Sequence, residues 1–138
     1  MRFMMVILRS DWPDTNKSAQ IDDVAAFEEM GKYNDQLKKA GILLAMDGLT
    51  PPSMGARVTY KNGKAKITDG PFTEAKEAIA GYWMIEVKSR EEALEWASRI
   101  PCMGDGMVEV RRVVEISDFD PDIQQKFAEK GAKLGVQR

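Results

Sequence analysis

The chain has 138 residues, of which 43% are hydrophobic and 30% charged, with a formal net charge of −2 and a pI of about 5.3. This length and composition are typical of one globular domain. The small negative net charge argues against a nucleic-acid backbone or an anionic membrane as the main partner. No apolar run reaches the ~18 residues of a membrane span. The first residues lack a signal-peptide cleavage pattern, so we expect a cytoplasmic protein.

The sequence contains no histidine and a single cysteine, Cys102. Histidine is the commonest general base and metal ligand, and the usual partner of a nucleophilic serine or cysteine. A Ser-His-Asp triad is therefore impossible, and a zinc site would lack its usual ligands. We expect no metal and no cofactor.

The first half of the chain alternates between strand and helix. Phe3–Arg9 is predicted to be a strand, and Ile21–Ala40 has the apolar spacing of a helix. Gly41 is a natural residue to end that helix, and Ile42–Met46 is predicted to be the next strand. One helix face is expected to point to the core, with Tyr33 directed away from it toward the surface or a dimer partner. That face comprises Val24, Phe27, Met30, Gly31, Asn34 and Leu37.

The second half begins with a hairpin. Asn62-Gly63 lies between the extended runs Arg57–Tyr60 and Lys64–Thr68, and both turn residues accept positive φ. The remaining elements are expected to be a strand, a helix with a capping box, a last strand and a weak tail helix. They span Gly81–Val87, Ser89–Ile100, Met107–Ile116 and about Pro121–Lys133.

This order of elements predicts an α+β fold with a largely antiparallel sheet and two main helices on one face. Two strand–helix–strand halves favour a ferredoxin-like arrangement. We expect a domain over residues 1–116 and a C-terminal tail over 117–138.

The run Thr68-Asp69-Gly70-Pro71-Phe72 predicts a rigid bend after a strand. It holds Asp69 and Phe72 in a fixed relation, so Asp69 is a candidate general base or ligand acceptor. The alternative is an Asx-type turn in which the carboxylate bonds nearby backbone N–H groups.

Asn34 is the clearest physical indication of a pocket, because a buried amide needs partners. It either lines a polar pocket or makes a structural hydrogen bond to a neighbouring strand. Trp83 and Tyr82 face opposite sides of one strand, so one is expected in the core and the other in a pocket or interface.

Four further side chains are candidate ligand contacts. Glu74 and Lys76 follow the bend, where the alternative is a solvated helix start. Asp47 begins a second Asp-Gly pair after its strand. Arg111 is suited to hold a carboxylate or phosphate, and the alternative is an ion pair with Glu86 or Glu109.

Three ordered signatures carry a family resemblance. The first joins Tyr33-Asn34, Leu37, Ala40-Gly41, Leu43-Leu44, Asp47-Gly48-Leu49 and Pro51; the second joins Thr68–Phe72, Glu74, Lys76-Glu77 and Gly81-Tyr82-Trp83; the third joins Arg90–Ala93, Trp96 and Val108–Arg111. Over about Met1–Ile116 the chain resembles the YCII-related family, in its DGPF-domain branch.

The resemblance implies a ferredoxin-like dimer, a dimeric α+β barrel, with a pocket near helix and sheet. In the wider family a His–Asp pair is associated with acid–base work. That pair cannot be transferred to a chain without histidine, and Asp69 is the acid that remains. Some DGPF-branch members lie near extracytoplasmic-function sigma factors.

Two functions follow as expectations. One is a homodimer that binds an unknown small molecule between the first helix and the sheet, acting as a weak lyase or isomerase with Asp69 as base. The other is a non-catalytic regulatory or protein-interaction module linked to sigma-factor regulation. A closed pocket that holds Asp69 beside Asn34 favours the first; a filled core with Asp69 in solvent favours the second.

Overall fold

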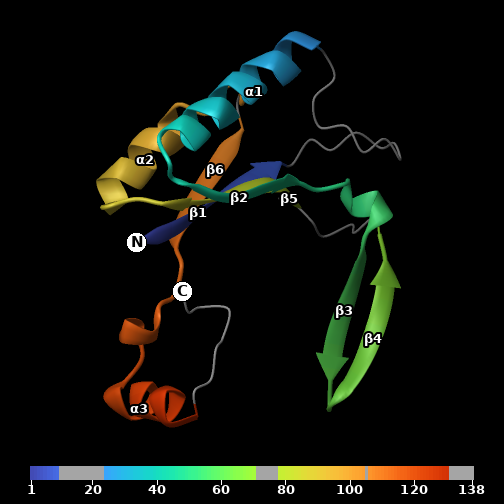
Figure 1. Cartoon of the computed structure of the whole chain (residues 1–138). Helices are drawn as coiled ribbons and strands as arrows, with labels where there is room; N and C mark the ends of the chain where they lie inside the picture. Colours follow the sequence, from blue (N-terminus) through green and yellow to red (C-terminus); the bar gives the residue numbers. More distant parts are fainter. Residues whose placement is uncertain (10–23, 71–77, 105, 131–138) are drawn as a thin grey trace.

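A computed structural model describes residues 1–9, 24–70, 78–104 and 106–130. It is an α+β fold, compatible with the ferredoxin-like arrangement, as predicted (Figure 1). Its elements are β1 Arg2–Arg9, α1 Val24–Lys39, β2 Leu43–Gly48, the 3-10 turn η1 Pro52–Met54, β3 Ala56–Lys61, β4 Lys64–Asp69, β5 Ala78–Glu86, α2 Arg90–Ser98, β6 Met107–Arg112, the 3-10 turn η2 Ile116–Asp118 and α3 Pro121–Lys130.

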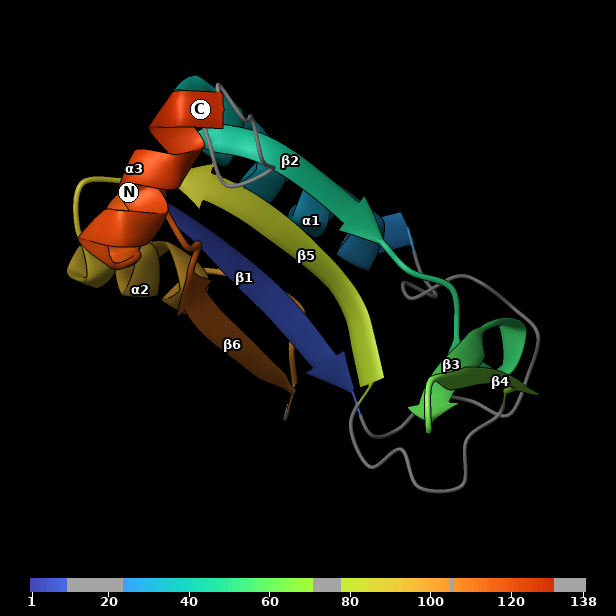
Figure 2. The same cartoon turned by 90° about the horizontal axis from the view of Figure 1, so that it is seen from below.

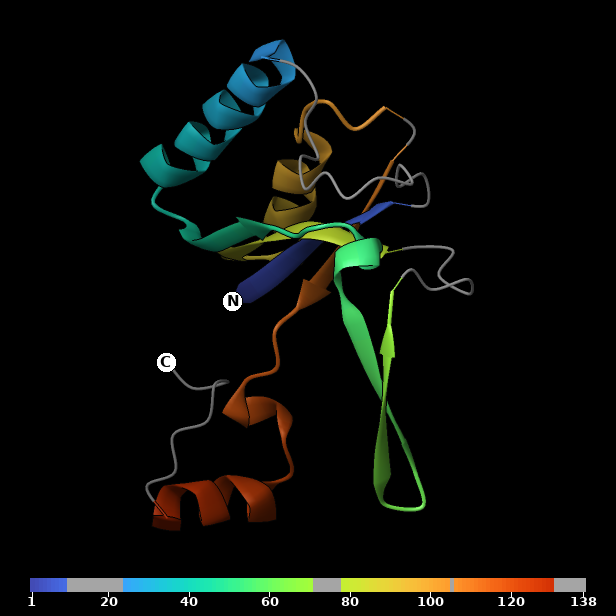
Figure 3. The same cartoon turned by 90° about the vertical axis from the view of Figure 1, so that its right-hand side faces the viewer.

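Four strands form an antiparallel sheet in the order β2-β5-β1-β6, which is visible from below in Figure 2. Helices α1 and α2 cover one face of this sheet. The β3–β4 hairpin and α3 extend on the opposite side (Figure 3). The sheet therefore has one face under helices and one face that those helices leave uncovered.

The core lies between the two helices and the sheet. Residues of β5 alternate as predicted, so that Trp83 and Ile85 are buried on the helix side. The remaining core is built from both helices and the strands beside β5. It comprises Phe3, Met5, Tyr33, Leu37, Ile42, Val87, Ala93 and Ile100.

The predicted inward face of α1 is confirmed at Leu37 and Met30 and is wrong at Val24 and Phe27, while Tyr33, predicted to point outward, is buried. Tyr33 and Leu37 are buried, whereas Val24 is 74% and Phe27 68% exposed. The phenol of Tyr33 donates a 2.8 Å hydrogen bond to the Trp96 carbonyl oxygen. Because this bond satisfies the hydroxyl group, the Tyr33 ring can lie in the core. The spacing of apolar residues alone does not predict this burial.

Local turn and cap signals are confirmed. Asn62 and Gly63 have φ of 52° and 77°, and Gly41 follows α1 with φ of 71°. The Ser89 hydroxyl accepts a hydrogen bond from the Glu92 backbone N–H at the start of α2. These positions are predictable because local backbone geometry and a local cap hydrogen bond select their residue types.

The ends of two strands differ from the prediction, because a strand extends only as far as it pairs with its neighbour in the sheet. The predicted strand Met107–Ile116 ends at Arg112, since its partner β1 begins at Arg2. Strand β2 continues through Asp47 and Gly48, which pair with β5. Asp47 therefore lies inside a strand and not in the turn after it.

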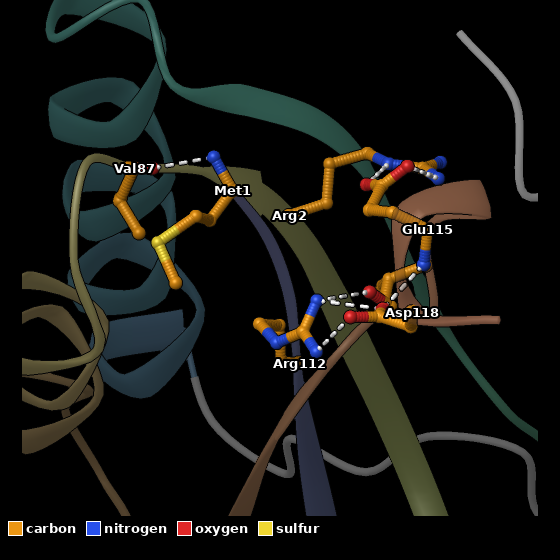
Figure 4. A network of polar contacts seen from close by, with 7 residues as sticks. Met1, Arg2, Val87, Arg112, Glu115 and Asp118 are labelled. Atoms are coloured by element: carbon orange, nitrogen blue, oxygen red, sulfur yellow. Dashed lines mark hydrogen bonds and ion pairs between the residues drawn. The ribbon is translucent and has the colours of Figure 1, made fainter. Parts of the chain in front are cut away.

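Two arginine–carboxylate pairs attach the C-terminal segment to the sheet (Figure 4). Arg2 donates to both carboxylate oxygens of Glu115 at 2.9 and 3.2 Å. Arg112 makes a similar fork with Asp118 at 2.7 and 2.9 Å. These bonds lower the pKa of Glu115 and of Asp118. The predicted tail helix follows as α3.

Burial raises the pKa of Tyr33 to about 12 from 10.0. An unfolded chain ionises this phenol first, so the stabilisation is complete below pH 10 and is lost as pH rises toward 12. We expect the free energy of unfolding to fall by roughly 1.3 kcal/mol by pH 11 from this group.

Tyr33→Phe should cost about 1 kcal/mol at pH 7, through the lost hydrogen bond, and should flatten the pH dependence. Urea unfolding at pH 8 and pH 11 measures both effects, with Tyr60→Phe as the control because Tyr60 is 76% exposed. An equal alkaline loss in Tyr33→Phe and wild type would contradict this account.

Candidate functional site

The structure pairs Asn34 with Trp83. The Trp83 indole N–H donates a 2.8 Å hydrogen bond to the Asn34 side-chain oxygen. The Tyr33 ring lies edge-on to Trp83, with centroids 5.6 Å apart. Of the two interpretations of Asn34, the structure therefore shows the hydrogen bond to a strand, and Trp83 is a core residue.

Asp69 is the last residue of β4, where it pairs with Ala56 and is exposed. The hairpin that it ends stands apart from the four-stranded sheet (Figure 1). Asn34 is instead bonded to a sheet residue beneath α1. The structure does not bring Asp69 and Asn34 together.

Position 70 requires a glycine because there is no room there for a side chain. The Gly70 N–H donates a 2.9 Å hydrogen bond to the Gly55 carbonyl oxygen. A Cβ at Gly70 would collide with the carbonyl oxygen of Pro52. Close approach to η1 therefore explains the glycine. Three predicted contacts after this turn, Phe72, Glu74 and Lys76, lie outside the described residues.

Asp47 and Tyr82 meet on the sheet face that α1 and α2 leave uncovered. They are register partners on β2 and β5. The Tyr82 hydroxyl donates a 2.8 Å hydrogen bond to Oδ2 of Asp47. This hydrogen bond, together with the charge of Asp47, raises the pKa of Tyr82.

The register extends this pair into two rows across the sheet. One row runs Asp47, Tyr82, Val6, Glu109; the next runs Ala45, Met84, Met4, Arg111. We call these eight residues the open face. Arg111 contacts Glu109 at 3.6 Å, so the ion pair considered as its alternative role is present.

The open face has an apolar middle and polar edges. Val6 is 8% exposed, and Met4 and Met84 are partly buried beside it. The Asp47–Tyr82 bond lies on one side of these residues and the Glu109–Arg111 pair on the other. The sequence had indicated Asp47, Tyr82 and Arg111 separately. Their common face, with Met4 and Val6 between them, follows from strand alternation plus the order of strands.

Metal binding has no support in the described part of the chain. No group of three or more Asp, Glu or Cys side chains there is placed to hold an ion. The carboxylates of the open face lie on different strands, and each bonds to a neighbouring side chain. The open face offers hydrogen-bonding groups, charges and apolar side chains.

Comparison with known proteins identifies the family. The model of the YCII-related domain matches residues 1–117. The chain belongs to the YCII-related family. It is also 27% identical over 92 residues to an uncharacterized protein of Rhizobium meliloti (strain 1021), a match that covers 67% of this chain and 74% of the relative. Assignment to the DGPF branch stays a prediction from Thr68–Phe72.

The match to the YCII-related domain ends at residue 117, within η2 and before α3. In the described ranges, no helix has the length and apolar character needed to cross a membrane.

Asp47→Asn should lower the pKa of Tyr82 toward its ordinary value, because the carboxylate that stabilises the protonated phenol is gone. Titration followed by the Tyr82 ring carbon in NMR measures this. Glu109→Gln is the matched control, since Glu109 is on the same face but bonds to Arg111. Equal Tyr82 pKa values in wild type and Asp47→Asn would refute the bond as the cause.

Proposed function

We propose that this YCII-related protein is a homodimer that binds a small molecule on the open face. One observation carries the proposal: the Asp47–Tyr82 hydrogen bond lies beside an apolar strip on a sheet face that no α1 or α2 residue covers. A sheet normally buries an apolar face against another layer. A second copy would supply that layer and remove the site from bulk water.

The proposed ligand has an apolar body and an amine or hydroxyl group. Oδ2 of Asp47 accepts from Tyr82, and Oδ1 bonds to none of the described residues. A carboxylate with one oxygen committed can still accept from a ligand donor. The two polar edges lie on β2 and β6, three strand spacings or about 14 Å apart. A ligand of that length would contact both edges.

The site differs from the one expected between α1 and the sheet. Trp83, Tyr33 and Leu37 occupy that space as core. The open face instead offers groups at the surface of the described chain, where a ligand can reach them. Enclosure by a second copy would strengthen the attraction between the Asp47 carboxylate and the donor group of the ligand, because charge interactions become stronger as the local dielectric constant falls.

A non-catalytic interaction module is the second candidate. A filled core with Asp69 in solvent is the arrangement expected of such a module. The core around Asn34 is filled, and Asp69 is exposed. A link to sigma-factor regulation and a cytoplasmic location belong to this proposal as predictions. Acid–base work by Asp69 also stays a prediction, and the open face makes Asp47 the better supported ligand carboxylate.

A thermal-shift screen with amines, alcohols and carboxylic acids on aliphatic and aromatic bodies tests the binding proposal. We expect at least one amine or alcohol to raise the melting temperature of the wild type. Affinity for that compound should fall about tenfold in Tyr82→Phe and in Asp47→Asn, the loss of one hydrogen bond at about 1.4 kcal/mol.

Tyr60→Phe is the matched control, because it removes a phenol hydroxyl from the hairpin. Compounds that bind Tyr82→Phe and Asp47→Asn as tightly as the wild type would refute the open face as the site. Loss of binding in Asp69→Asn alone would place the site at the hairpin instead.

A further inference from the structure

The β3–β4 hairpin, Ala56–Asp69, carries a local positive charge in a chain that is acidic overall. It has four basic side chains and one acidic one, a formal charge of +3, whereas the whole chain has −2. The hairpin extends from the four-stranded sheet (Figure 3), and six residues of strand reach about 20 Å. Charges are screened within about 8 Å at physiological salt. The acidic remainder of the chain therefore does not cancel the charge of the hairpin.

Strand pairing gathers all the basic side chains of the hairpin on one face. Alternation along the two paired strands gives this face no acidic residue. We call it the basic row, and it comprises Arg57, Thr59, Lys61, Lys64, Lys66 and Thr68.

The two lysines of β4 are the part of the basic row most open to a partner. Lys64 and Lys66 are two residues apart, so they project from the same face about 7 Å from each other. Both are exposed. Among the described residues, neither ammonium group has a carboxylate within ion-pair distance.

The outer edge of β4 also has free backbone groups. In the described ranges, β4 pairs with β3 alone. The bond from the Gly70 N–H to the Gly55 carbonyl oxygen makes that pair a hydrogen-bonded one, and such pairs alternate with non-bonded ones along an antiparallel ladder. Lys66 therefore directs its N–H and C=O toward β3, while Ala65 and Ile67 direct theirs outward. An edge of this kind is a template for another strand.

The edge of β4 is formed before any partner arrives. Asn62 and Gly63 adopt the positive φ values of a tight hairpin turn. At the base, Pro51 is fully buried and Gly70 lies against the carbonyl oxygen of Pro52. A strand that binds a preformed edge does not have to order that edge, which favours binding.

A second copy of this chain does not fit the edge. Two β4 strands side by side would place the Lys64 and Lys66 row of one copy beside the same row of the other. Like charges that face each other across paired strands are destabilising. Lysine on an edge strand is one way in which proteins prevent such self-pairing. The edge therefore selects a strand of the opposite charge.

The other face of the hairpin specifies the remaining positions of such a strand. Ile67 is 71% exposed, and Tyr60 and Val58 on the same face are 76% and 48% exposed. Side chains of an added strand alternate between the two faces. Every second residue would lie beside the lysines, and the residues between them would extend the apolar face next to Ile67.

We propose that the outer edge of β4 binds an extended acidic segment of another protein by strand addition. The segment alternates acidic and apolar residues, and its acids lie about 5 Å from Lys64 and Lys66. Its backbone pairs with the outward N–H and C=O groups of Ala65 and Ile67. The inference goes beyond the ligand-binding proposal, since it uses neither the open face nor a dimer. It gives the interaction-module candidate a surface and a class of partner.

A panel of short labelled peptides, in which glutamate alternates with valine, isoleucine or tyrosine, tests the proposal by fluorescence anisotropy. We expect at least one to bind the full-length protein, and its affinity to fall as salt is raised. Lys64→Glu with Lys66→Glu should weaken binding at least tenfold, through two lost attractions and two new repulsions. Lys126→Glu with Lys130→Glu makes the same charge change on exposed lysines of α3 and should leave affinity within twofold.

Amide hydrogen exchange locates the bound peptide without any substitution. We expect the Ala65 and Ile67 amides to become protected when the peptide binds. The Lys66 amide, already directed at β3, should change little. The Val58 and Tyr60 amides, on the outer edge of β3, should exchange as they do in the free protein.

Peptides of the same composition, with the glutamates and the apolar residues in two separate blocks, are the matched control. Equal binding of block and alternating peptides, or bound peptide with unprotected Ala65 and Ile67 amides, overturns strand addition. Binding by none of the alternating peptides also overturns it and leaves the lysines the role of preventing self-pairing.

A single-stranded oligonucleotide separates the two kinds of acidic partner. If it binds more tightly than every acidic peptide and loses affinity in Lys64→Glu with Lys66→Glu, the basic row is a nucleic-acid contact and the proposal is wrong. Ligand binding at Asp47 and Tyr82 is measured separately by thermal shift, so either proposal can fail while the other stands.

Discussion

The alternation of side chains along β5 is the constraint on which the rest of the structure depends. Trp83 points to the helices, where it donates to Asn34 and contacts Tyr33, and this locks α1 on the sheet. Tyr82, one residue earlier, must then point to the other face. There it donates to Asp47. One central strand thus fixes the core on one side and the candidate site on the other.

In the part of the chain that the structure describes, two apolar surfaces have no helix packed on them. The open face has a middle of Met4, Val6 and Met84 without a helix above it, and the hairpin exposes Val58, Tyr60 and Ile67. Each surface lacks the second layer that sheets ordinarily need. We propose that a second copy supplies this layer over the open face and encloses the ligand site there.

Much of the fold could be predicted from local chemistry. Asn62-Gly63 and Gly41 act through their own backbone geometry and Ser89 through a hydroxyl that caps the adjacent helix, so their roles were visible in sequence. The burial of Tyr33 was not visible, because its hydroxyl finds its partner in the Trp96 carbonyl oxygen, far along the chain. The residues of the candidate site were predicted one by one, without their common position on the sheet. Asp47, Tyr82 and Arg111 come together through strand order, a long-range property, and Gly70 is explained by the approach of Pro52.

NMR of the Met4 and Met84 methyl groups with a paramagnetic cosolute, followed as protein concentration is varied, tests the central claim that a second copy covers the open face. The account predicts that the cosolute broadens these two methyl signals in dilute protein and broadens them less as the dimer fraction rises. The methyl signal of Met54, which is 51% exposed and lies outside the open face, should be broadened at every concentration. Met4 and Met84 signals that are broadened equally at every concentration would contradict it.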